Sequence, residues 1–298
     1  MPQRQERRIG GALFAGPDNP KRYELASFRN LHGRLRRRHE RLSRLAYVYG
    51  VSDQLLQFHL ECLRLVEHRP EEETRHGTFL NAFIGLSTKV VSHAESIRSL
   101  MGIGRYGDAA AITRGFIGDV TMIRYLSMYP EDCPDWVELL TLRGLTPPRR
   151  GRYRQLFEKF RESTMRRKME EAGCRPVSAK GYGSYSEALH PSAWGLQFYA
   201  HVEPHPKADH THTFYYAPTY EPWVALREAS VMTALLLEPI ESFMYWCEKA
   251  GVTWHKELLA RWSPIQEMAI RTCEAGMATA TAMFEHFYRP REEDSGSI

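Results

Sequence analysis

Long hydrophobic runs are missing from this chain of 298 residues. The best apolar stretch, Met232–Leu237, ends at a glutamate and a proline, far short of the roughly 20 residues that a membrane-spanning helix needs. The first residues, MPQRQERRIGG, have no apolar core after their charges, so we expect no secretory signal. A membrane protein is therefore not the expected class, and we expect no membrane partner.

Cysteine is scarce and scattered. The chain has five cysteines, and none of them forms a CxxC pair, so a disulfide framework is not expected. Thiols of this kind stay reduced in the cytoplasm and pack within helices. We therefore expect a cytoplasmic protein with free thiols at Cys62, Cys133, Cys174, Cys247 and Cys273.

Several motifs of common enzyme classes are also lacking. The chain has no GxGxxG opening a βαβ unit, no Walker loop, no GxSxG and no HExxH. The segment GIGRYG is only a loose glycine match, and it lies between two expected helices rather than after a strand. We also see no internal repeat and no strand pair with hairpin signals, and we interpret TFYYAPTYEPW as loop.

What the chain does have is an ordinary globular composition with an uneven charge. It is 43% hydrophobic and 26% charged, with a formal net charge of +4. Residues 1–44 hold 12 Lys and Arg but four Asp and Glu, a net charge of +8. This pattern is compatible with contact to a polyanion, and a solvated arm is the alternative. The candidate nucleic-acid-binding residues are Arg34, Arg36, Arg37, Arg38 and Arg41.

Hydrophobic spacing predicts an all-α fold, an antiparallel helical bundle. We expect a basic arm and helix start over 1–45, one helical domain over 46–290 and a disordered tail over 291–298. The bundle is built on two helix pairs, and the short connection within the first pair indicates antiparallel packing. The expected helices are 78–101 with 105–129, and 223–250 with 263–288.

The first pair has the clearest periodicity. Its first helix places apolar residues at alternating steps of four and three, the pattern of a heptad seam. His93 occupies one of these core positions, and we expect a neutral imidazole satisfied by a carbonyl or hydroxyl. Asp119 interrupts the seam of the second helix, so its carboxylate needs a partner or a raised pKa. The seams are Phe79, Phe83, Leu86, Val90, His93, Ile97 and Leu100, and Ala109, Ile112, Phe116, Asp119, Ile123 and Leu126.

Local signals also suggest where other helices begin and end. Gly50 should break an early helix, and Ser52 can cap the next one. Residues 150–171 are expected as one charged, outer helix with a thin apolar stripe. The last helix should begin at Ser263, because Ser263-Pro264 resembles a capping box start.

The segment 182–212 concentrates five of the chain's 13 histidines. Imidazole and carboxylate ligands suit zinc or another divalent ion, so a metal-dependent hydrolase is one alternative. The spacings match no tight zinc motif, however, and a solvated loop explains them as well. No other cofactor is expected. The candidate metal ligands are His201, His205, His210 and His212.

Two motifs carry a resemblance. The segment GRYGDAAAITRGFIGDVTMIRYL over 104–126 and the later YSEALHPS over 185–192 resemble a bacterial all-helical family of unknown function, loosely related to the HEPN domains of many toxin and antiphage ribonucleases. The resemblance covers about 78–250 and implies a HEPN-like core. Its motifs point to Arg114 in the first segment and to Tyr185, Ser186 and His190 in the second.

The chain departs from the family's pattern in two ways. The family's glutamate position is Gly118 here, and Asp119 follows it; Arg114 and Asp119 should point well apart on a helix. The ribonuclease motif, an arginine four to six residues before a histidine, lacks its arginine ahead of His190, where Tyr185 stands instead. Residues 34–39 fit that spacing, but within an arginine-rich run where a chance match is expected.

The resulting hypothesis is an RNA- or nucleotide-directed protein of a bacterial stress or phage-defence system. In its active form it would cleave RNA without metal. His190 would transfer the proton and Arg114 would stabilise the phosphorane charge, with Asp119, Tyr185 and Ser186 as further site candidates. The alternative interpretation is that His190 ends a helix before Pro191 and caps its last carbonyls. The alternative function is a non-catalytic helical binding module, with a homodimer through an exposed helix pair as one form of it.

Overall fold

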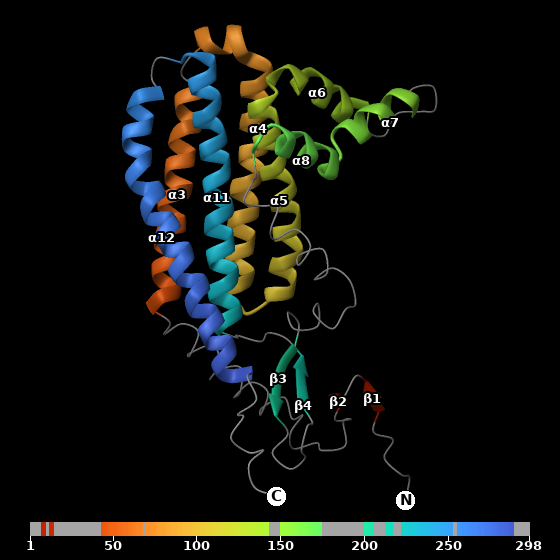
Figure 1. The fold of residues 1–298 in the computed structure, drawn as a ribbon, viewed down its shortest axis with the longest axis vertical. Helices are drawn as coiled ribbons and strands as arrows, with labels where there is room; N and C mark the ends of the chain where they lie inside the picture. Colours follow the sequence, from red (N-terminus) through yellow and green to blue (C-terminus); the bar gives the residue numbers. More distant parts are fainter. Residues whose placement is uncertain are drawn as a thin grey trace, which may run out of the picture.

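The all-α fold is confirmed by a computed structural model of the protein. The structure describes residues 7–9, 12–14, 43–67, 70–142, 150–174, 200–204, 212–216, 222–252 and 255–288. Long helices run side by side over most of its length (Figure 1). They are α3 (Ser43–Glu67), α4 (Pro70–Gly102), α5 (Tyr106–Met128), α11 (Pro222–Ala250) and α12 (His255–Tyr288). Among these described helices, none is long and apolar enough to cross a membrane.

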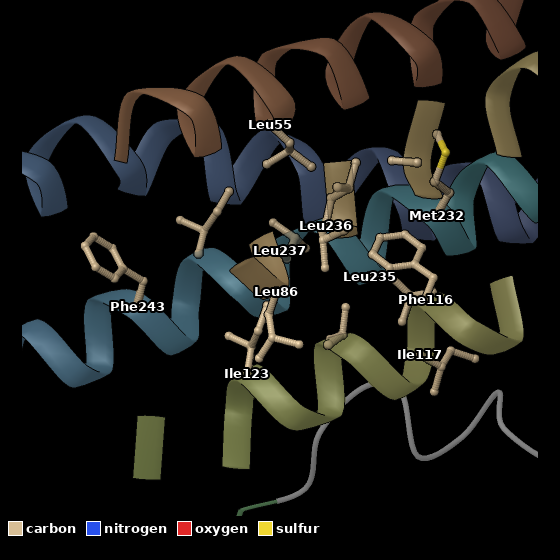
Figure 2. Close-up of a cluster of buried hydrophobic side chains, with 14 of the residues drawn as sticks. Leu55, Leu86, Phe116, Ile117, Ile123, Met232, Leu235, Leu236, Leu237 and Phe243 are labelled. Carbon is tan, nitrogen blue, oxygen red and sulfur yellow. The ribbon is translucent and has the colours of Figure 1, made fainter. Parts of the chain in front are cut away.

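Helix α11 holds the bundle together. It contacts α3, α4, α5 and α12, and its side chains are buried along most of its length. Figure 2 shows Leu235, Leu236 and Met232 of this helix meeting apolar side chains from the neighbouring helices. Burial of this kind contributes roughly 25 cal/mol for each Å² of apolar surface removed from water, so the position of α11 fixes the others.

The expected pairing of α4 with α5 is present. Only residues 103–105 separate the two helices, and Gly104 takes the positive φ of 75° that this tight connection requires. The apolar members of both seams face inward; Val90 and Ile97 on α4 and Phe116 on α5 are fully buried. The sequence therefore predicted this half of the bundle correctly.

A smaller group of helices lies beside α5, on the side of the bundle away from α12 (Figure 1). It comprises η1 (Pro130–Asp132), α6 (Cys133–Leu142), α7 (Arg150–Lys159) and α8 (Glu162–Glu171). The expectation of one helix over 150–171 was wrong. The backbone of Arg161 is extended, with φ −64° and ψ 133°, and it breaks the segment into α7 and α8.

Two other helix boundaries differ from expectation. Helix α3 continues through Gly50, and Ser52 is not a cap: its hydroxyl donates to the carbonyl of Val48 and lies 2.7 Å from Thr233 Oγ1 on α11. Helix α12 begins at His255, so Ser263 and Pro264 lie inside it. A glycine in a helix costs only about 1 kcal/mol, which tertiary packing against α11 outweighs.

Two short antiparallel hairpins correct the expectation that no strands pair. Strand β1 (Arg7–Ile9) pairs with β2 (Ala12–Phe14), and β3 (Ala200–Pro204) pairs with β4 (His212–Tyr216). Strand β4 lies in a segment that we interpreted as loop. Its threonine and aromatic residues favour strands, and Pro204 stands at the end of β3, where proline is tolerated.

Candidate functional site

The structure describes only part of the predicted site. Arg114 and Asp119 lie on α5. The second motif, with Tyr185, Ser186 and His190, falls within 175–199 and lies outside the described residues. The arginines of the basic arm also lie outside them, namely Arg34, Arg36, Arg37, Arg38 and Arg41.

Of the predicted metal site, the structure describes only the two strands β3 and β4, which contain His201 and His212. The register pairs His201 with Tyr215 and Pro204 with His212. The backbones of the two histidines are therefore three ladder positions apart, about 10 Å along the strands. His205 and His210 lie outside the described residues. Within the part of the chain that the structure describes, no group of His, Cys, Asp and Glu could hold a metal ion, and the site at the histidine loop stays a prediction.

Arg114 is anchored by the smaller group of helices. Its Nη2 lies 3.2 Å from Glu162 Oε2 on α8, and the other oxygen of Glu162 lies 2.7 Å from Arg166 Nη2. The Arg114 side chain is 23% exposed and that of Glu162 is 15% exposed. Two guanidiniums thus share one carboxylate, and these three groups keep a net charge of +1.

A polar network on the same side holds α8 in place. Asp132 accepts hydrogen bonds from Tyr125 at 2.6 Å and Lys168 at 3.2 Å, and Lys159 Nζ lies 2.7 Å from its second oxygen. Burial alone would raise the pKa of Asp132, but these hydrogen bonds outweigh it and the pKa is lowered. The network ties α7 and α8 to the end of α5, which fixes Glu162 beside Arg114.

Asp119 has partners of its own, both from α4. Lys89 Nζ donates to Asp119 Oδ1 at 2.7 Å, and His93 Nδ1 lies 3.1 Å from Asp119 Oδ2. The contact with His93 is close but is not aligned as a hydrogen bond. The carboxylate is 10% exposed, His93 is 23% exposed and Lys89 is 57% exposed. The cluster therefore lies at the edge of the seam, within reach of solvent.

His93 is expected to be neutral at pH 7. Burial lowers the pKa of His93; the charge of Asp119 opposes this shift and that of Lys89 adds to it. The neutral state matches the sequence-based expectation. The expected partner does not, because a carboxylate faces the imidazole instead of a carbonyl or a hydroxyl.

Small residues occupy much of the surface of α5 between Arg114 and Asp119, and Met122 follows one turn further along the helix. At 100° per residue the two positions are 140° apart around the helix, so they form no pair, as predicted. Ala111, Gly115 and Gly118 fall between them, and we call these three residues the glycine strip. A Cβ at Gly115 would meet His93 Cε1 at 3.5 Å, and one at Gly118 would meet Arg114 Nη1 at 4.0 Å. The strip is bordered by an imidazole on one side and a guanidinium on the other.

A separate hollow lies near the ends of α5 and α11. Its volume is about 1010 Å³, the size of a small-molecule site. Phe79 and Trp246 form an apolar floor, and Lys249 and Glu131 line it with opposite charges. The hollow includes none of the predicted site residues.

The chain matches no protein-family model, no curated protein and no solved structure. The resemblance to the HEPN-related family therefore stays a prediction.

Sequence reasoning noticed His93 and Asp119 but did not pair them, and it missed Lys89 and Glu162. A signal for the first pairing was present. The two polar residues interrupt facing seams of antiparallel helices joined by a three-residue connection, which places 93 opposite about 116. The ring of His93 indeed lies 6.4 Å from that of Phe116, one turn from Asp119.

Proposed function

We propose that this protein is an RNA- or nucleotide-directed helical protein of a bacterial stress or phage-defence system, HEPN-like in its core. The observation that carries the proposal is the arginine beside the glycine strip. Arg114 is held by Glu162 at a partly exposed position next to bare helix backbone. A guanidinium held in this way is suited to bidentate contact with a phosphate.

The basic arm supports the same class of ligand. Residues 1–44 carry a net charge of +8, whereas the remainder carries −4. Positive charge concentrated in one segment attracts the phosphate backbone without regard to base sequence. We place this activity in the cytoplasm, because all five cysteines are free thiols.

The test is RNA binding by the full chain. We expect a fluorescent single-stranded RNA to bind, with affinity that falls steeply as salt rises from 50 to 200 mM. Replacing the five candidate arm arginines by glutamine should reduce the salt slope, and Arg114→Gln should weaken binding. Arg271→Gln, on the exposed surface of α12, is the matched control and should leave binding unchanged. Failure to bind any RNA or nucleotide at low salt would overturn the proposal.

In the catalytic form of this proposal, His190 and Arg114 cleave RNA without metal. The experiment compares RNA degradation by the parent chain and by His190→Ala, with a chelator present. Activity lost in the variant supports the catalytic form. Equal activity in both chains removes His190 from the mechanism.

One observation favours a non-catalytic binding module instead. Glu162 occupies the guanidinium of Arg114, so a phosphate must share or displace a carboxylate that is itself held by Arg166. Such an arrangement suits positioning of a bound strand more directly than stabilisation of a transition state. RNA binding without any degradation by the parent chain would decide for this form.

A further inference from the structure

We infer that His93, positioned by Asp119, is the general base of a phosphodiester-cleaving site that faces Arg114 across the glycine strip. The inference rests on the proposed function and assigns its chemistry to a cluster that the HEPN-like motifs do not include. The substrate class is RNA, because the step requires a 2′-hydroxyl group beside the phosphate.

The first argument is the arrangement of the imidazole. Asp119 Oδ2 lies 3.1 Å from His93 Nδ1, which is within hydrogen-bonding distance. With its proton on Nδ1, the ring leaves Nε2 as the acceptor of a second proton. A carboxylate that orients an imidazole in this way is the usual support of a histidine base. Asp119 is therefore a positioning residue, with Lys89 as its second partner.

The second argument is access. His93 is 23% exposed, although it occupies a seam position where its apolar neighbours Val90 and Ile97 are fully buried. Its Cε1 borders Gly115, whose missing side chain leaves the approach to the ring open. A histidine that served only to fill the seam would not need a charged partner and an open side.

The third argument is the span of the site. Cβ positions three residues apart on a helix are separated by about 5–6 Å. Together with the distances at Gly115 and Gly118, this places His93 Cε1 and Arg114 Nη1 within about 13 Å of each other. This distance is an upper limit, and a bound dinucleotide is long enough to contact both groups.

The reaction balances without metal. The 2′-oxygen forms a bond to the adjacent phosphorus while His93 Nε2 takes the hydroxyl proton. The bond from phosphorus to the 5′-oxygen breaks, and that oxygen takes a proton from water. The hydroxide formed removes the proton from His93, which restores the neutral imidazole. The products are a 2′,3′-cyclic phosphate and a 5′-hydroxyl end, and Arg114 stabilises the negative charge on the phosphorane oxygens.

The experiment measures cleavage and binding of the same RNA by the full-length chain, with a chelator present. His93→Gln should lower the cleavage rate about 100-fold or more, the contribution typical of a general base, and should change RNA binding far less. The same strand with deoxyribose in place of every ribose should bind and stay intact, because it lacks the attacking 2′-hydroxyl group. Circular dichroism and retained binding show that the variant is folded.

Asp119→Asn provides a second readout, the pH profile of cleavage. The rate should rise with pH as His93 loses its proton. The negative charge of Asp119 raises the pKa of His93, so removing that charge should move the rise to lower pH, with a lower maximal rate. A purely structural role of Asp119 would lower the rate without moving the profile.

The outcomes separate this inference from the proposed function. Binding without cleavage by the parent chain overturns the inference and leaves the proposed function standing. Absence of binding overturns both. Cleavage that survives His93→Gln but is lost in His190→Ala overturns the inference and supports the site predicted from the sequence motif.

Discussion

Two histidines in neighbouring helices have opposite surroundings. His59 on α3 is fully buried, its ring lies 6.0 Å from that of Phe83, and neither ring nitrogen has a hydrogen-bond partner among the described residues. His93 on α4 is partly exposed and faces a carboxylate. Burial lowers the pKa of both imidazoles. The comparison teaches that burial alone makes a histidine costly to the fold, whereas a charged partner and an open side make it suited to chemistry.

The same contrast extends to the glycines near them. Gly276 on α12 lies in the interior, against Ser230 of α11, where a Cβ would clash with Ser230 Oγ. Gly115 on α5 is exposed and leaves space beside His93. Gly276 allows α11 and α12 to approach closely, whereas Gly115 leaves part of the surface of α5 open.

The largest expected effect is acid destabilisation through His59. The pKa of His59 is lowered from 6.5 to about 4 in the folded protein, because burial disfavours the imidazolium. Between these values the unfolded chain binds a proton that the folded chain does not. Stability should therefore be complete above pH 6.5 and fall by about 3 kcal/mol as the pH drops to 4. Urea unfolding at a series of pH values measures this slope.

Replacing the histidine tests its cause. His59→Leu should remove most of the slope and raise the free energy of unfolding at pH 7, since an unpartnered buried polar group is lost. His93→Leu is the matched control and should keep most of the slope. Equal slopes in the parent chain and in His59→Leu would show that other groups take up the protons.

The next largest effect concerns the contact between α11 and α12. Gly276→Ala should destabilise the fold by about 2 kcal/mol, because the added methyl group would lie 3.3 Å from Ser230 Cβ and closer still to its hydroxyl. Adding Ser230→Ala should recover part of the loss. Thermal or urea unfolding gives both values. A neutral Gly276→Ala would mean that the two helices separate at little cost.

Periodicity predicted the α4–α5 pair because seam residues are selected by burial, and burial leaves a spacing in the sequence. It could not predict the partners of the polar groups. Glu162 meets Arg114 only because a break at Arg161 turns α8 toward α5. Lys89 is one of many exposed lysines and arginines, and only the helix pairing brings it to Asp119.

The wrong helix boundaries have a common cause. Gly50 and Ser263 are local signals worth about 1 kcal/mol each. The helices that contain them bury several large side chains, including Leu55 on α3 and Trp262 on α12, and each such side chain contributes more than one local signal. Local signals therefore decide helix ends only where packing does not.

A smaller effect should separate stability from function at the glycine strip. Gly115→Ala should stabilise the fold by about 1 kcal/mol through helix propensity, because its Cβ would meet His93 only at ordinary contact distance. It should also weaken RNA binding or cleavage, because it covers the approach to the imidazole. Gly85→Ala on the exposed side of α4 is the control and should stabilise equally without any change toward RNA. Equal behaviour of the two variants toward RNA would show that the strip is not a binding surface.

The smallest expected effect on stability belongs to Lys89. Its ion pair with Asp119 is more than half exposed on the lysine side, so Lys89→Met should change the free energy of unfolding by less than about 1 kcal/mol. The imidazole should respond more clearly. The charge of Lys89 lowers the pKa of His93, so its removal should move the titration of the His93 ring proton signals to higher pH in NMR spectra. The signals of His59 should not move, because its pKa is lowered by burial and not by a charged group. A His93 titration that does not move in Lys89→Met would mean that lysine, carboxylate and imidazole do not act as one cluster. His93 would then be, like His59, a histidine whose pKa is set by burial.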